Sequence, residues 1–163
     1  MADEKTLDDL FLDTLKDIYF AEKKILVALP KMAKAAHSDQ LRKAFEKHRT
    51  ETEGQVKRIE QIFEMMEKPA RGKTCPAILG LVEEGQEIMK EFKKSDAHDA
   101  GVLAGAQAVE HYEISRYGTL IAWADQLGMR DASWLLKQTL EEEKKADATL
   151  TKLAVRSLNQ MAA

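Results

Sequence analysis

Two acidic residues stand where a helix in the segment GAQAVEHYEISRYGTL would face the interior of the protein. With 3.6 residues per turn, the inward face of that helix collects Ala106, Glu110, Glu113, Tyr117 and Leu120. A buried carboxylate without a partner costs several kcal/mol. The pattern therefore predicts that protons or cations neutralise Glu110 and Glu113 inside the fold.

Acidic residues also interrupt the apolar stripes of three other predicted helices, each near the middle of the helix. They are Glu22 in a helix expected over 6–36, Glu51 in one over 39–67, and both Glu143 and Asp147 in one over 131–160. A face exposed to solvent would not interrupt four separate stripes at one height, so we expect a single polar centre. The side chains expected beside its acids are Gln55, His48, Tyr19 and Tyr117.

The spacing of the acids from the predicted turns places them at one level. Glu22 and Glu51 are equally far from the turn between the first two helices, and Glu113 and Glu143 are equally far from Gly128. A short turn makes its two helices antiparallel, so such pairs lie side by side. At 1.5 Å per residue, each pair lies roughly 22 Å from its turn, near the middle of the helices.

A bound metal is the simplest source of positive charge for this centre, because no lysine or arginine lies on the four inward stripes. Ligation by oxygen suits iron, manganese, magnesium or calcium. Ligands held rigidly on four helices favour a small ion over calcium. The alternative is that the acids share protons and hydrogen bonds among themselves.

The elements that must position these acids are helices, because the apolar period is three to four residues and strand-like alternation is absent. The expected fold class is all-α, with two antiparallel helical hairpins. A long connection over 68–96 joins the hairpins and includes a shorter fifth helix. Since that connection can return along the bundle, helices 39–67 and 97–127 are expected to run parallel.

Residue types that begin and end helices stand at the expected boundaries. Thr6, paired with Asp9, is the predicted N-cap of the first helix, and Ser38 that of the second. Either Thr74 or Cys75 is expected to cap the short helix that begins at Pro76, and Asp131 the last helix. Gly128 is the predicted stop of helix 97–127. Pro30 lacks a backbone donor, so it should kink or break the end of helix 6–36.

Bulk properties narrow the function classes for this 163-residue chain, which we expect to form one domain over 1–163. The net charge of −3 and the absence of a dense basic face argue against nucleic acid. No apolar run is long enough to cross a membrane. The polar N-terminal segment MADEKTLDD does not resemble a secretory signal, and Cys75 is the only cysteine. We therefore expect a cytoplasmic protein.

Three stretches, LPKMAKAA, VEHYEISRYGTLIAWADQLG and TLEEEKKAD, closely resemble the YciF-like bacterial stress proteins of the ferritin-like superfamily. The resemblance covers nearly the whole chain. It implies a ferritin-like four-helix bundle that forms a homodimer, is induced under stress and has a proposed dinuclear metal centre. It implies no settled activity.

The resemblance assigns metal positions one residue at a time. In order along the chain, the matched carboxylates are Glu22, Glu51, the Glu-x-x-Glu pair Glu110 and Glu113, and Glu143. Asp147 stands where rubrerythrins place a histidine. Gly54 and Ala146 occupy positions that carry a histidine in the usual pattern, so no histidine ligand is expected unless His48 turns inward.

Three functional hypotheses follow. The first is a metal-binding stress protein in which these six acids hold two iron ions, or manganese, that react with oxygen or peroxide; its electron donor is unknown. The second is a non-catalytic structural or interaction protein whose carboxylate centre is a relic. The third, less favoured, is an iron-storage cage.

Overall fold

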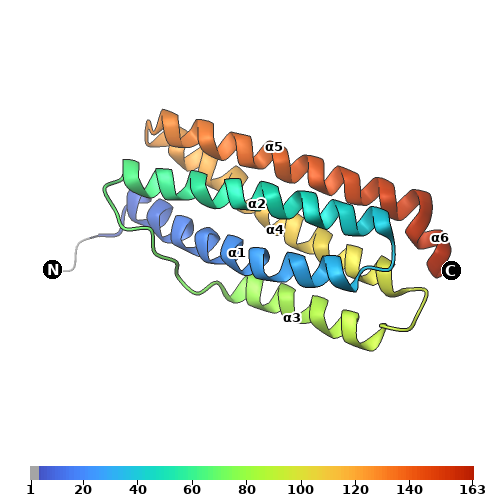
Figure 1. Cartoon of the computed structure of the whole chain (residues 1–163). Coiled ribbons are helices and arrows are strands. Elements are labelled where there is room, and N and C mark those ends of the chain that lie inside the picture. Colours follow the sequence, from blue (N-terminus) through green and yellow to red (C-terminus); the bar gives the residue numbers. More distant parts are fainter. Residues whose placement is uncertain (1–3) are drawn as a thin grey trace.

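The structure, a computed structural model, describes residues 4–163 (Figure 1). The long elements are α1 (Leu7–Ala35), α2 (Asp39–Met65), α3 (Pro76–Glu91), α4 (His98–Gln126) and α5 (Arg130–Leu153). A π-helical segment, η1 (Ala154–Leu158), and the short α6 (Asn159–Ala162) follow where α5 was expected to continue. The described residues contain no strand, and none of their helices is long and apolar enough to cross a membrane. Residues 1–3 of the N-terminal segment lie outside the described part.

The helices form two antiparallel hairpins, α1–α2 and α4–α5, that pack into a four-helix bundle (Figure 1). α2 and α4 run in the same direction, as the long connection predicted. α3 lies within that connection and packs on the outside of the groove between α1 and α4. The predicted all-α bundle with a fifth helix in the crossover is confirmed.

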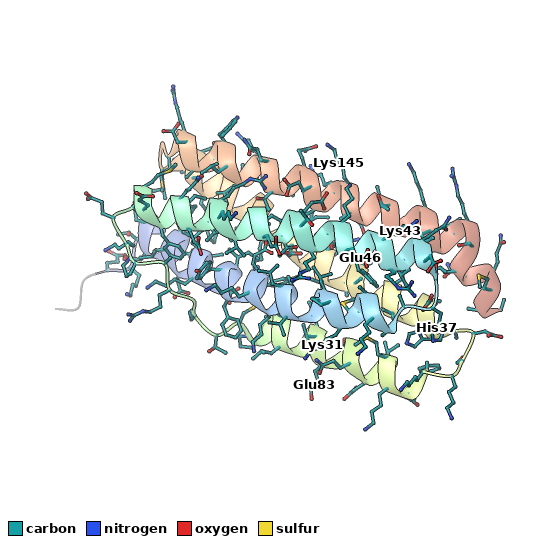
Figure 2. All side chains as sticks on the ribbon, viewed as in Figure 1. Lys31, His37, Lys43, Glu46, Glu83 and Lys145 are labelled. Carbon is teal, nitrogen blue, oxygen red and sulfur yellow. The ribbon has the colours of Figure 1, made fainter. Side chains whose placement is uncertain are left out.

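Charged side chains cover the outside of the bundle, and apolar side chains fill both ends of its interior. Lys43, Glu46 and Lys145 point away from it into solvent (Figure 2). The interior is apolar towards both ends, with Phe11 and Leu15 buried towards one end and Leu103 and Leu150 towards the other. Burial of apolar side chains stabilises the fold by about 1.5–3 kcal/mol for each large one. These layers hold the polar middle of the bundle in place.

Three predicted helix starts are confirmed. Thr6 and Asp9 form a capping box, in which the Asp9 N–H donates to Thr6 Oγ1 and the Thr6 N–H donates to Asp9 Oδ2. The Ser38 hydroxyl caps α2. Cys75, not Thr74, is the N-cap of α3, directly ahead of Pro76. The caps satisfy backbone donors that a helix start otherwise leaves without partners.

One prediction at a helix end is narrowed, and one at a helix start is wrong. α1 continues through Pro30 to Ala35, so of the kink or break expected there, the break does not occur. α5 begins at Arg130 with Met129 as its N-cap, two residues earlier than a cap at Asp131 would allow. Gly128, with a φ of +72°, turns the chain so tightly that the next helix starts at once. Asp131 instead lies in the first turn, where its charge complements the helix dipole.

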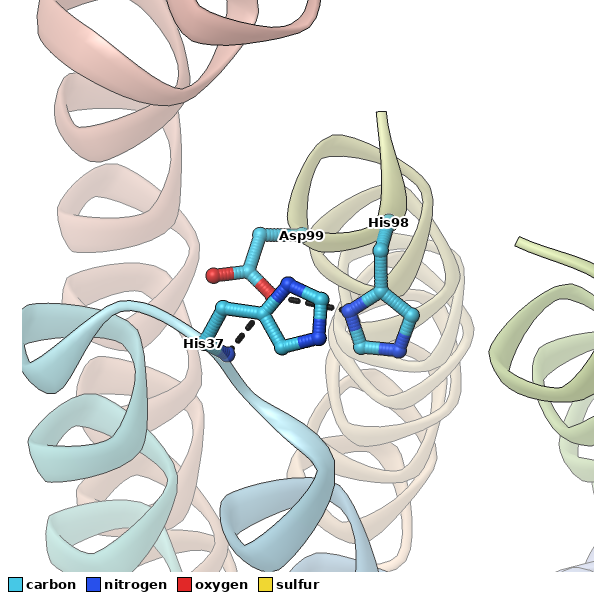
Figure 3. Close-up of side chains that lie close together, drawn as sticks. All are labelled: His37, His98 and Asp99. Atoms are coloured by element: carbon cyan, nitrogen blue, oxygen red, sulfur yellow. Dashed lines mark hydrogen bonds and ion pairs between the residues drawn. The ribbon is translucent and has the colours of Figure 1, made fainter. Parts of the chain in front are cut away.

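Asp99 connects the start of α4 to the turn between α1 and α2 (Figure 3). Its Oδ1 accepts from the backbone N–H of His37 at 2.9 Å, and its Oδ2 accepts from that of Ser38 at 2.6 Å. The His98 ring lies 2.9 Å from the same carboxylate through Nδ1, and it stacks on the His37 ring with centroids 4.3 Å apart. This contact fixes one end of the α1–α2 hairpin against α4.

We expect Asp99→Asn to lower the free energy of unfolding by about 1–3 kcal/mol, because Asn has one acceptor oxygen and its amide nitrogen cannot accept from the second backbone donor. Although burial alone would raise the pKa of Asp99, hydrogen bonds from the His37 backbone and the His98 ring lower it overall. A lowered carboxyl pKa stabilises the fold above the unfolded value of 3.8, and this stabilisation is lost as pH falls through the folded value.

Urea unfolding at pH 7 and pH 3 measures both effects. Asp96→Asn, at an exposed position in the same segment, is the matched control and should leave stability unchanged. Equal stability of Asp99→Asn and wild type at pH 7 would show that this contact does not stabilise the fold.

Candidate metal centre

Acidic side chains from three helices meet in the middle of the bundle, where the sequence predicts a polar centre. Glu22 on α1, Glu113 on α4 and Glu143 on α5 are completely buried, and Glu110 on α4 is 3% exposed. α2 contributes His48, which is also buried. One ligand atom from each of His48, Glu110, Glu113 and Glu143 lies within 4.8 Å of the others. We call these four residues and Glu22 the carboxylate cluster.

Most oxygen atoms of the carboxylate cluster have no hydrogen-bond partner. Both oxygens of Glu113 and Glu143 are unpaired, as are Oε2 of Glu22 and Oε2 of Glu110. Buried polar atoms in proteins are hydrogen-bonded in roughly nine cases out of ten. Unpaired acceptors gathered in one place are typical of a site for positive ions. The carboxylate cluster could therefore hold a metal ion.

His48 is the one basic side chain inside the carboxylate cluster. Its Nε2 lies 2.9 Å from Oε1 of Glu110 and 3.7 Å from Oε2 of Glu143, and its Nδ1 lies 3.3 Å from Oε2 of Glu51. Burial alone would lower the pKa of His48, but Glu110 and Glu51 raise it well above its usual value. His48 therefore offers either a cation that offsets part of the acidic charge or a neutral nitrogen ligand.

Three acids of the carboxylate cluster, Glu22, Glu113 and Glu143, bind protons more tightly than ordinary glutamates. Burial raises the pKa of Glu22 to about 7, although Glu113 and the Tyr117 hydroxyl, which donates to Glu22 Oε1, lower it in part. Burial and the neighbouring carboxylates raise the pKa of Glu113 and that of Glu143 well above 4.5. Without a cation, the cluster is therefore partly protonated near neutral pH.

Glu51 lies at the edge of the carboxylate cluster, not inside it. Its side chain is 21% exposed and pairs with Lys47 at 3.2 Å as well as with His48. The buried stripe of α2 passes through Thr52 instead, whose hydroxyl donates to the His48 carbonyl. Neighbouring positions on a helix point about 100° apart. With Thr52 on the inward face of α2, Glu51 therefore lies at the rim.

Asp147 is not brought into the carboxylate cluster, which corrects its expected position. It lies on the flank between α5 and α4, where Oδ1 is 3.2 Å from the Gln107 amide and 3.0 Å from the exposed His111 ring. From Glu143 the inward face of α5 continues through Ala146 to Leu150. A residue four positions after Glu143 therefore points towards α4.

Two of the four predicted neighbours contact the cluster directly. Tyr117 donates to Glu22, and His48 lies among the acids. Tyr19 instead points to α2, where its hydroxyl donates to Glu60 at 3.0 Å. Gln55 is buried, and its amide donates to Glu142 at 3.0 Å.

An ion pair that the sequence analysis missed lies beside Gln55. Arg58 binds Glu142 with both guanidinium nitrogens, at 2.6 and 3.0 Å, and also donates to Thr139. The residues come from α2 and α5, so the pair joins these two helices next to the polar centre. Neither residue interrupts an apolar stripe, so periodicity gave no signal for them.

Residues 6–163 match the family described as a domain of unknown function, DUF892. The chain belongs to the DUF892 family. It is 45% identical to Protein YciF of Escherichia coli K12 over 159 residues, which cover 97% of this chain and 96% of that protein. The predicted membership of the YciF-like family is confirmed.

Solved structures agree with this assignment. The crystal structure of the E. coli stress protein YciF matches with a TM-score of 0.91 and covers 96% of this chain and 99% of that chain. YcfI of Rhodopseudomonas palustris, described as a candidate structural protein, matches with a TM-score of 0.87 at 45% identity, covering 92% of this chain and 96% of its own. The protein XCC3681 of Xanthomonas campestris, at 17% identity and a TM-score of 0.77 over 96% of both chains, shares the fold.

We expect the metal-free DUF892 protein to lose stability as pH rises. The folded pKa of Glu22, about 7, exceeds the unfolded value of 4.5, so the folded state holds more protons between these values. The stability that Glu22 contributes is greatest below about pH 4.5 and is lost as pH rises through 7, by on the order of 3 kcal/mol. The raised pKa of His48 acts in the same direction above 6.5.

Guanidinium unfolding of chelator-treated protein at pH 5 and pH 8 measures this loss. Glu113→Gln removes one ionisable group from the cluster and should flatten the profile. A wild-type stability that is flat or rises between these pH values would contradict the buried, proton-binding state of the acids.

Proposed function

We propose that this DUF892 protein is a ferritin-like stress protein whose carboxylate cluster binds two divalent metal ions, iron first and manganese second. The single observation that carries the proposal is the set of buried, unpaired oxygens on Glu113 and Glu143. Four buried oxygens without hydrogen-bond partners are stabilised by a cation that binds them directly.

The composition of the carboxylate cluster suits such ions. Carboxylates with one imidazole are typical ligands for iron and manganese, whereas zinc usually takes more nitrogen or sulfur. The residues that would hold the metal are Glu22, His48, Glu110, Glu113 and Glu143, and Glu51 lies next to them at the rim through its contact with His48. Asp147 is not in the proposed set.

A bound iron pair would supply redox chemistry with oxygen or peroxide and Lewis acidity. The contribution of the chain is to bury the ligands and to orient them. Tyr117 holds one oxygen of Glu22, and Glu51 holds the His48 ring through Nδ1. Such supporting hydrogen bonds fix the orientation of metal ligands. Cys75 is the only cysteine, so the electron donor would be another molecule.

A structural role without metal is the second candidate, and one observation favours it. His48 supplies a positive charge inside the cluster, and the raised carboxyl pKa values allow the remaining acids to hold protons instead of metal. The description of the relative YcfI as a candidate structural protein fits this role. Under either candidate, the proposed partner is a second copy of the chain in a homodimer.

We expect Glu113→Gln and Glu143→Gln to lose at least one equivalent of bound iron or manganese, because each removes a charged ligand from the middle of the site. Metal content after anaerobic loading and gel filtration, measured by mass spectrometry, tests this. Glu46→Gln, on the solvent face of α2 (Figure 2), is the matched control. Unchanged stoichiometry in both cluster variants would reject the assignment.

Chelator sensitivity separates the two candidate functions. A metal that binds only the folded state raises the melting temperature. We therefore expect chelator to lower the melting temperature of wild type and to have little effect on Glu113→Gln. The structural candidate predicts that wild type also melts at one temperature with and without chelator.

A further inference from the structure

A largely apolar cavity adjoins the carboxylate cluster in the half of the bundle that α3 covers. Its walls include Ile25 on α1, Phe45 on α2, Val82 on α3, Val109 on α4 and Leu150 on α5. At one end it reaches His48, Glu51 and Glu110. The cavity therefore joins an apolar chamber to the polar centre, the usual composition of a small-molecule site.

Small side chains create this space. Every one of the five long helices contributes at least one alanine or glycine to the wall: Ala28, Ala44, Gly85, Gly105, Ala106 and Ala146. Ala106 is buried and the other five are partly buried, so larger side chains at these positions would narrow the cavity. At Gly85 and Gly105 the helices α3 and α4 approach closely, and a Cβ on Gly105 would lie 3.6 Å from the Gly85 Cα.

The cavity is elongated along the bundle axis. Its wall runs from Val102 to Glu110 on α4 and from Leu81 to Met89 on α3. At 1.5 Å per residue, each stretch is roughly 12 Å long. Lys31 and Gln86 are exposed wall residues on α1 and α3, so the cavity reaches solvent between these helices, where Lys31 is labelled in Figure 2. The shape fits an unbranched chain.

The polar end of the cavity has a free hydrogen-bond acceptor. Oε2 of Glu110 is buried without a hydrogen-bond partner, while Nε2 of His48 lies 2.9 Å from Oε1 of the same carboxylate. A hydroxyl group can donate to this free oxygen. An ionised carboxylate head would instead lie beside the carboxylates of Glu110 and Glu51, where like charges repel.

We propose that this cavity is a binding site for an unbranched aliphatic alcohol, with the chain between α1, α3 and α4 and the hydroxyl at His48 and Glu110. Unlike the proposed metal binding, this site depends on the apolar walls and can be tested in metal-free protein. Failure of one proposal therefore leaves the other standing.

Calorimetric titration of chelator-treated, full-length protein with 1-octanol tests the site. We expect saturable binding of one molecule per chain, with octanoate binding at least tenfold more weakly. Ala106→Leu fills the buried wall and should weaken binding at least tenfold. Ala104→Leu, on the exposed face of the same helix, is the matched control and should bind as wild type does.

Ala28→Leu fills the half-buried wall on α1 and decides the matter if Ala106→Leu does not fold. Loss of binding in a filled variant with a native circular dichroism spectrum supports the site. No saturable octanol binding to wild type, or undiminished binding in the folded filled variants, overturns it. Octanoate binding as tightly as octanol overturns the assigned hydroxyl head.

Discussion

The burial of acidic side chains is the constraint on which the rest of the structure depends. Glu22, Glu110, Glu113 and Glu143 lie in the middle of the bundle with few donors near them. Removing ionised groups from water costs far more than a typical domain can spare from its marginal net stability. The chain can keep these residues only if protons, His48 or bound cations neutralise them.

The surrounding fold holds the buried acids together in the middle of the bundle. Apolar layers at both ends of the bundle stabilise the helices independently of the middle. Asp99 ties the α1–α2 turn to α4, and the Arg58–Glu142 pair joins α2 to α5 beside Gln55. These contacts limit how far the four helices can separate, so the acids cannot relieve their repulsion by moving apart.

Helical periodicity predicted most of the fold and the core of the site, because a stripe on a long helix is defined by many residues. The positions of Glu22, Glu110, Glu113 and Glu143 follow from it. It could not decide residues at the edge of a stripe, where a rotation by one position exchanges inside and outside. Asp147 was assigned inward for this reason.

Contacts between side chains of different helices were the other feature that periodicity could not predict. His48 lies on the inward stripe of α2, but only the packing of α2 against α4 and α5 shows that its ring lies between two carboxylates.

Anomalous diffraction at the iron edge, from crystals of protein loaded with ferrous iron, tests the central claim most directly. We predict density peaks between His48, Glu110, Glu113 and Glu143. A well-ordered cluster without any anomalous peak would show that protons and His48 alone neutralise the acids.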